Sequence, residues 1–523
     1  MALAVPAMRV MRRSPRRAPR VLVLVSVLVA AALLSPLVFL VLKASNAGWH
    51  SVQHLLFRRL TRVLLVNTVE LAAAVSAACA VLGTAAAWVI ERTGIPGRRA
   101  WAVLVVLPVA IPDFVVGYSW HSIAPAVQGL AGATLVMTLA LYPLVYLPVA
   151  AALRRADPAE EEVARSLGLG PIRTFLSVTL RQVRPAISGG CLVVCLAMLA
   201  EYGAFEIVRF QTFTTTIFGE LNNGFDPGGA SGLSIVLVII AMIVLAGEAG
   251  VSTRGRLARS AGQAAPVSAR RPLRPRYMAV AICGMAVLAG LGLGMPIGTL
   301  VYWMAASHAT TVPVASLWSA LAHTAGYSAA AALVATVMAL PVALLSVRFR
   351  SPAVMVLERS TYLSQCLPGI VVALALVYFA ERYALRLYQR SPLLIAAYSV
   401  LYFPLALISV RTSVAQAPRR LEEVARSLGY RPLSVMARIT LPLVAPGLAA
   451  GFCLVFLSAA TELTATLLLV PTGVNTLATQ FWAYQIANSY GAAAPYAVAI
   501  VALAAIPGYL LTTWFDRRPG FDP

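Results

Sequence analysis

Long apolar runs recur along the whole chain, and they limit what it can fold into more than any other feature. A helix needs about 20 apolar residues to cross the hydrocarbon core of a bilayer. Hydrophobic residues make up 60% of the 523 and charged residues only 11%, whereas a soluble domain carries roughly 25% charged residues. The runs lack the period-two alternation of barrel strands, and lipid offers no partner to unpaired backbone groups. The sequence therefore predicts an all-α, polytopic membrane protein.

Prolines, glycines and charged residues divide these runs into about twelve expected spans. They are 21–43, 63–90, 100–120, 131–153, 186–208, 231–250, 277–304, 321–347, 355–379, 392–413, 446–470 and 494–514. Pro112 and Pro368 lie in the third span of each half and are expected to break or kink it, because proline cannot donate to the helical ladder.

The N-terminal apolar run imitates a secretory signal peptide, because six arginines between Arg9 and Arg20 precede it. The run from Val21 to Leu42 is too long for the apolar region of such a peptide, and no small-x-small cleavage site follows it. We interpret it as a retained first span.

Basic residues set the expected orientation. Of the 41 lysines and arginines, 33 fall in segments that are cytoplasmic when the N-terminus is inside, as the positive-inside rule requires. The formal charge of +22 is explained by these loops, so nucleic-acid binding is not expected. The sequence predicts a multi-pass protein of the bacterial inner membrane with both termini cytoplasmic.

A polar, arginine-rich stretch without apolar periodicity separates six expected spans from the next six, as a flexible linker would. The expected segments are a basic N-terminus (1–20), a first membrane domain (21–250), the linker (251–276), a second membrane domain (277–514) and a tail (515–523).

An internal repeat carries most of the functional information. Residues 161–187 and 422–448 share 13 of 27 residues at a constant spacing of 261, and both begin with Glu-Glu-Val-Ala-Arg-Ser-Leu-Gly. Each copy falls in the expected cytoplasmic loop between the fourth and fifth spans of its half. A six-span unit is thus used twice.

The residues of each copy predict a short helix at the membrane surface. In the first copy Asp157 can cap it and Pro158 suits its first turn, while Gly168 ends it in the left-handed conformation and Pro171 prevents its resumption. The expected apolar stripe is Val163, Ala164 and Leu167. Such a helix suits docking into a groove on a partner protein. The alternative is a solvated helix left over from duplication, but the neighbouring spans have diverged while this loop has not.

This repeated loop resembles the "EAA" loop of permease subunits of ATP-binding-cassette importers. The resemblance covers essentially the whole chain and implies a MetI-like permease fold in each half. It implies two copies of a partner ATPase, one at each loop, and an extracytoplasmic solute-binding protein. The residues that it assigns to ATPase coupling are Glu161, Glu162, Ala164, Arg165, Gly168, Glu422, Glu423, Ala425, Arg426 and Gly429.

Two departures from the family pattern leave open whether both loops dock equally well. Arg181 stands in the first copy where the second has Pro442, and the second copy has Ala417-Pro418-Arg419-Arg420 in place of an acidic cap.

The chain carries no phosphate-binding loop of the GxxxxGK[ST] type. No pair of its six cysteines has zinc-site spacing, and disulfides are not expected. We therefore expect no catalytic residues, no metal site and no cofactor on this chain, with ATP and Mg²⁺ held by the partner subunit.

The cargo follows from resemblance alone. Fusion of two permease halves in one chain is similar to importers of ferric iron, and then of thiamine or a phosphonate. Candidate residues of the translocation path are the intramembrane acids Glu201 and Glu462, which occupy equivalent positions, and less strongly Asp113 and Glu70. Intramembrane carboxylates usually face a cavity or a partner, so the alternative is that they hold helices together.

Two other classes of protein share parts of this outline. Twelve spans in two halves also suit an ion-coupled secondary transporter, but that class does not need the repeated loop helix. A membrane enzyme would need a nucleophile elbow, a metal cluster or a pair of acids on one cytoplasmic face, and the sequence offers none of these.

Overall fold

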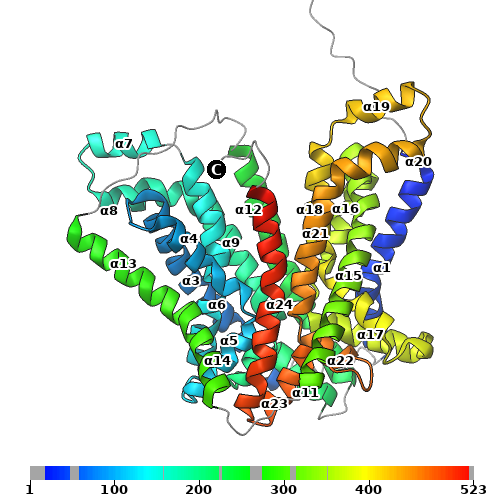
Figure 1. The fold of residues 1–523 in the computed structure, drawn as a ribbon, viewed down its shortest axis with the longest axis horizontal. Helices are drawn as coiled ribbons and strands as arrows, with labels where there is room; N and C mark the ends of the chain where they lie inside the picture. Colours follow the sequence, from blue (N-terminus) through cyan, green and yellow to red (C-terminus); the bar gives the residue numbers. More distant parts are fainter. Residues whose placement is uncertain are drawn as a thin grey trace, which may run out of the picture.

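The computed structural model describes residues 18–46, 58–156, 158–222, 227–258, 274–306, 314–349 and 351–516. Within these ranges the chain forms α-helices joined by short 3-10 and π-helical turns, and contains no β-strand. Long helices run between two faces of the molecule, and short helices cover each face (Figure 1). The predicted all-α fold is confirmed.

The following helices of the first half occupy the regions of its expected spans. They are α1 (Arg20–Asn46), α3 (Arg59–Arg92), α4 (Arg98–Val106), α5 (Asp113–Ile123), α6 (Gly129–Arg155), α9 (Leu180–Ala200) and α12 (Pro227–Ala258). The short helices are α7 (Pro158–Ser166), α8 (Pro171–Thr174), α10 (Gly203–Ile207) and α11 (Phe213–Asn222).

The second half repeats this order. Its long helices are α13 (Pro275–Ala289) and its continuation α14 (Met295–Ala306), α15 (Val314–Arg348), α16 (Pro352–Tyr362), α17 (Gly369–Tyr383), α18 (Ser391–Gln416), α21 (Leu441–Ala460) and α24 (Tyr490–Asp516). Its short helices are α19 (Arg419–Ser427), α20 (Pro432–Val435), α22 (Thr464–Leu469) and α23 (Leu477–Ile486).

In the described part of the chain, nine helical segments are long and apolar enough to cross a bilayer. The pair formed by α4 and α5, bent by 91°, would make a tenth. Of the two remaining expected spans, that at 355–379 is divided into α16 and α17, and the last is occupied by α24, whose part Tyr490–Ile506 is apolar.

Breaks inside the membrane domains are of two kinds. The breaks expected at Pro112 and Pro368 are confirmed, because α5 and α17 begin directly after them. The spans expected at 186–208 and 446–470 are wrong as continuous helices, since α9 ends at Ala200 and α21 at Ala460. Each break contains an acidic residue. The Glu201 carboxylate accepts the Ala204 N–H at 2.7 Å, and the Glu462 carboxylate accepts the Ala465 N–H at 2.8 Å. These side chains replace helical backbone bonds and stabilise the break.

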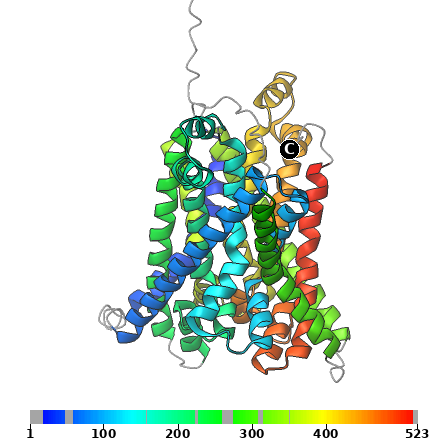
Figure 2. The same ribbon diagram turned by 90° about the vertical axis from the view of Figure 1, so that its left-hand side faces the viewer.

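The two halves interlock. Helix α1 packs against α15, α16 and α17 of the second half, while α13 packs against α4 and α14 against α5 of the first half. In Figure 1, α1 and α13 consequently lie at opposite edges of the molecule, and Figure 2 shows the same helices from the side. Each of the two hydrophobic cores draws residues from both halves. Residues of both halves therefore form the centre of the molecule.

Candidate functional site: two loop helices and a central cavity

The first repeated loop forms helix α7, and its end is built as the sequence predicts. Gly168 has a φ of +84°, in the left-handed region that glycine adopts without strain. The Gly168 N–H donates to the Arg165 carbonyl at 2.8 Å, and the Leu169 N–H donates to the Ala164 carbonyl at 3.2 Å. This pair of bonds is a Schellman cap. Asp157, the expected N-terminal cap, lies outside the described residues.

The second repeated loop forms helix α19 with the same ending. Gly429 also has a φ of +84°, its N–H donates to the Arg426 carbonyl at 3.1 Å, and the Tyr430 N–H donates to the Ala425 carbonyl at 3.1 Å. Helices α7 and α19 lie on the same face of the molecule, one above each half (Figure 1). We call this the loop-helix face.

Each loop helix has an outer and an inner side. Val163 and Leu167 are 58% and 77% exposed, and Leu428 is 72% exposed. Glu162, Gly168, Arg426 and Gly429 are also exposed, while Arg165 and Glu423 are half-buried. These residues form the outer side of each loop helix.

The inner side of each loop helix is buried. Glu161 and Glu422 are only 6% and 9% exposed, and Ala164 and Ala425 are buried as well. These four residues, which the sequence assigns to ATPase coupling, pack against the chain's own helices. The reason is geometric: on a helix, residues three apart share a face, and this face is the one that lies on the membrane domain.

A central cavity collects the acids at the helix breaks. It has a volume of about 390 Å³ and is lined by Asp113, Glu201 and Glu462, among other residues of both halves. The structure thus brings together three of the four predicted path residues. Glu70 is the exception, since it is exposed on α3 and does not line this cavity.

The two halves contribute differently to the cavity. The Tyr402 hydroxyl donates to Glu462 Oε2 at 2.8 Å, whereas the repeat places Leu141 at the equivalent position of the first half. Asp113 begins α5, and Gly369 begins α17 in its place. A Cβ atom at Gly369 would lie 2.8 Å from Glu462 Oε1. Glycine at this position therefore leaves room for the Glu462 carboxylate.

Three carboxyl groups and a phenol line this cavity, and an ionised carboxylate in a desolvated site is stabilised by a neighbouring opposite charge. Among the described residues, no three histidine, cysteine, aspartate or glutamate side chains are arranged to hold a metal ion.

Comparison with known proteins decides the family. The model of the family described as "Binding-protein-dependent transport system inner membrane component" matches the chain twice, over residues 79–247 and 335–520. The chain belongs to this family of permeases. The two matches contain one loop helix each, which agrees with the internal repeat.

Several curated permeases are similar to this one. An Fe(3+)-transport system permease protein of Haemophilus influenzae is 37% identical over 507 residues, which cover 95% of this chain and 99% of the relative. A sulfate transport system permease protein of Synechocystis is 31% identical over 32% of this chain and 67% of its own. A molybdenum transport system permease protein of Escherichia coli is 30% identical over 30% of this chain and 79% of its own. All three are named as permease proteins of transport systems.

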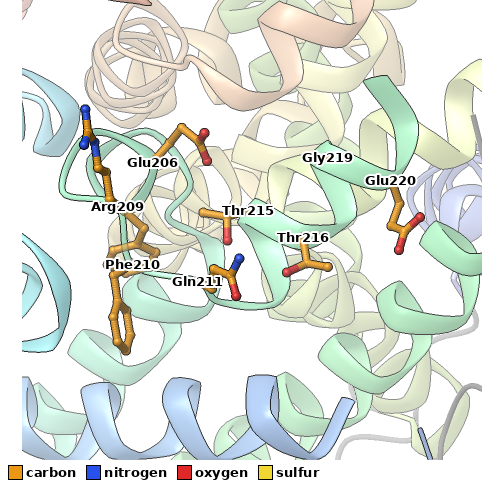
Figure 3. A pocket seen from close by; sticks show the side chains of 9 residues that line it. Glu206, Arg209, Phe210, Gln211, Thr215, Thr216, Gly219 and Glu220 are labelled. Carbon is orange, nitrogen blue, oxygen red and sulfur yellow. The ribbon is translucent and has the colours of Figure 1, made fainter. Parts of the chain in front are cut away.

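The permease has a second cavity on the face opposite the loop helices. It measures about 520 Å³ and lies between α10 and α11. Its lining combines acidic, basic and hydroxyl side chains, which Figure 3 shows around the hollow: Glu206, Arg209, Gln211, Thr215, Thr216 and Glu220. Arg209 has a φ of +54°, an uncommon conformation for a residue other than glycine.

Sequence reasoning missed Tyr402, which touches Glu462. A signal was present, because Tyr402 lies two residues before Pro404 and the first half has Pro143 at the equivalent position. Comparing the two fourth spans would have placed Tyr402 on the level of the helix breaks.

Proposed function

We propose that this permease is the transmembrane subunit of an ATP-driven importer of ferric iron, moved by a separate ATPase that docks on α7 and α19. The observation that carries the proposal is the pair of loop helices with identical caps and matching outer sides. Each presents a valine and a leucine that the chain itself leaves exposed: Val163 and Leu167 on α7, and Val424 and Leu428 on α19.

The outer residues suit a groove on a partner. Burying one leucine or valine side chain contributes about 1.5–3 kcal/mol, so four of them provide a substantial share of a docking energy. Exposed apolar residues gathered at the end of a membrane domain favour a protein interface over solvent. Glu162, which is exposed on α7, adds a charge that can fix the register of the partner.

The energy source and the orientation belong to the same proposal. The chain has no phosphate-binding loop, so ATP and Mg²⁺ would be held by two copies of the ATPase subunit. The loop-helix face would then be cytoplasmic, with both termini on that side. The halves 21–250 and 277–514 would move against each other as the ATPase dimer closes, and this would give alternating access.

Ferric iron is the cargo best supported. The relative that matches nearly the whole chain is named an Fe(3+)-transport permease, and the acids around the central cavity favour a cation. The sulfate and molybdenum permeases match only one third of the chain or less. An anionic cargo would meet Asp113, Glu201 and Glu462 at the centre of the molecule, and like charges there would repel it. Carboxylate and phenol oxygens are hard ligands suited to a hard cation.

An extracytoplasmic binding protein would deliver the cargo to the opposite face. The cavity of about 520 Å³ between α10 and α11 is our candidate for part of its docking surface. Its mixed charges suit the polar rim of a transient interface.

Changing the outer leucines tests the docking. With Leu167→Asp and Leu428→Asp together, we expect the ATPase subunit no longer to co-purify with the permease, because two buried charges would replace two apolar anchors. The matched control is Leu385→Asp, an exposed leucine in the turn before α18, at its opposite end from α19. Undiminished co-purification of the double variant would refute docking at these helices.

Reconstituted vesicles test the transport class. Uptake of ferric iron should require the ATPase subunit and ATP, and it should continue when ion gradients are collapsed. Uptake driven by a proton or sodium gradient alone would indicate a secondary transporter instead.

A further inference from the structure

The buried glutamate of each loop helix is held by the same two kinds of side chain. Glu422 Oε1 accepts from Arg348 Nη2 at 2.8 Å and from Thr440 Oγ1 at 3.3 Å. In the first half, Glu161 Oε1 accepts from Thr179 Oγ1 at 3.0 Å. Arg92 Nη2 lies 3.4 Å from the same oxygen. Each half thus contains an arginine–glutamate–threonine cluster beneath its loop helix.

The arginine comes from the end of the long helix that starts the core of each half. Arg92 is the last residue of α3 and Arg348 the last of α15. Residues 89–93 and 345–349 occupy equivalent positions, and arginine is the one residue that they share. The arginine is therefore retained where its neighbours have diverged.

The threonine comes from an unusual turn. Thr179 and Thr440 each end a five-residue π-helical segment, Phe175–Thr179 and Met436–Thr440. An α-helix follows each segment directly, α9 in the first half and α21 in the second. π-Helical turns are rare and often occur at functional sites, and this one occurs at the same place in both halves.

The composition of the cluster indicates more than a contribution to stability. An ion pair buried between helices often stabilises a fold no better than apolar side chains of similar size. What distinguishes the cluster is its geometry. The arginine, the glutamate and the threonine come from three different segments, and their directional interactions hold these segments in one arrangement. Here the three segments are the loop helix, the end of α3 or α15, and the start of α9 or α21.

We propose that these clusters are latches that transmit the movement of each loop helix to the helices framing the central cavity. Glu161 and Glu422 would be positioning residues of transport rather than contacts of the ATPase. One helix connects each latch with the central cavity. Helix α9 begins beside Thr179 and ends immediately before Glu201, and α21 begins beside Thr440 and ends two residues before Glu462. This inference rests on the proposed docking of an ATPase at α7 and α19.

The two latches are not equally tight. In the first half Arg92 Nε and Nη2 make no hydrogen bond within the described residues, and Arg165 holds the second oxygen of Glu161 at 3.1 Å. In the second half Arg348 bonds Glu422 directly, and Arg426 is 3.8 Å away. We therefore expect loss of Glu422 to affect coupling more than loss of Glu161.

The test separates assembly from coupling. Glu161→Gln and Glu422→Gln, singly and together, are purified with the ATPase subunit and reconstituted, and both ATP hydrolysis and iron uptake are measured. Because the outer leucines are unchanged, the ATPase should still co-purify. Uptake per ATP hydrolysed should fall at least fivefold in the double variant, with the larger part due to Glu422→Gln. Thr179→Val with Thr440→Val should lower the same ratio less, since each removes one hydrogen bond.

Two controls make the outcome specific. Glu358→Gln breaks another ion pair of the second half, with Arg411 at 2.9 Å, and should leave uptake per ATP unchanged. Arg348→Glu alone and Glu422→Arg alone should each lower the uptake per ATP hydrolysed. The protein that carries both substitutions has the ion pair reversed, and its uptake per ATP should be higher than that of either single variant.

Unchanged uptake per ATP in the assembled double variant would overturn the latch. Loss of ATPase co-purification in a double variant with the normal melting temperature would also overturn it, because Glu161 and Glu422 would then act in docking. The proposed function fails by a different result, namely persistence of the ATPase complex in the Leu167→Asp and Leu428→Asp variant.

Discussion

At the scale of single residues, carboxylates decide where the membrane helices stop. Glu201 and Glu462 each accept a backbone N–H three residues ahead, as capping residues do at helix starts. Each carboxylate therefore has a structural partner, and each still lines the central cavity. The two alternatives for these acids, structural pairing and a role in the path, are compatible.

Replacing both acids separates the two roles. In the variant with Glu201→Gln and Glu462→Gln, the amide oxygen can still accept the backbone N–H, so the fold should be retained while the negative charge is lost. We expect iron uptake by reconstituted vesicles to fall by about tenfold or more, equivalent to about 1.4 kcal/mol of lost cation stabilisation. Glu70→Gln is the control, since Glu70 lies outside the cavity. Equal uptake by the double variant and the control would show that charge in the cavity plays no part in transport.

Much of the site at this scale could be predicted, because it repeats. The spacing of 261 is enough to pair Glu201 with Glu462 and Gly168 with Gly429. Burial of Glu161 and Glu422 could not be predicted, since an acidic residue on a surface helix is mostly solvated. Its burial depends on Arg92 and Arg348, which lie far away in the chain.

At the scale of helices, close crossings rest on glycines. A Cβ atom at Gly83 of α3 would lie 2.9 Å from the Tyr142 carbonyl oxygen and the Tyr146 nitrogen of α6. At Gly447 of α21 it would collide with Ser413 of α18. Small residues at such crossings let backbones approach closely, which is a main source of helix association in membranes.

Adding a methyl group at Gly83 tests the α3–α6 crossing. Because two of the three nearest atoms belong to the backbone of α6, Gly83→Ala should force the helices apart and destabilise the protein by about 1–3 kcal/mol. The melting temperature of the purified protein in detergent should drop measurably. Gly189→Ala is the matched control, since Gly189 is also helical and no atom lies within 4 Å of its added Cβ. A variant at Gly83 as stable as the control would contradict the tight crossing.

The predicted helix ends were correct where proline marks them and wrong where a side-chain hydrogen bond ends the helix. Pro112 and Pro368 mark their breaks because proline lacks a backbone donor. No proline follows Ala200, so the sequence suggested a helix continuing to residue 208. The helix stops there because a carboxylate satisfies the freed N–H, and hydropathy carries no information about that bond.

At the scale of the whole molecule, the halves are intertwined rather than side by side. Helix α1 belongs to the first half but packs in the second, and α13 and α14 do the reverse. The Tyr118 hydroxyl also donates to the Tyr490 carbonyl across the two halves at 2.6 Å. The sequence could not predict this exchange, because an apolar side chain facing lipid and one facing a helix look alike.

Interlocking predicts how a divided chain will behave. If the chain is cut in the linker and expressed as residues 1–258 and 274–523, the two fragments should associate in the membrane and co-purify, because each hydrophobic core needs residues from both. Either fragment expressed alone should be degraded or aggregate, since α1 or α13 and α14 would lose the helices that cover them. Removing residues 1–57 from the first fragment should weaken co-purification, because α1 contacts α15, α16 and α17.

A fragment that is monodisperse alone, with the melting temperature of the assembled pair, would show that each half folds independently. The two loop helices would then be held together by the partner ATPase and not by the membrane domain, and coupling would depend on the ATPase dimer alone to move the halves together.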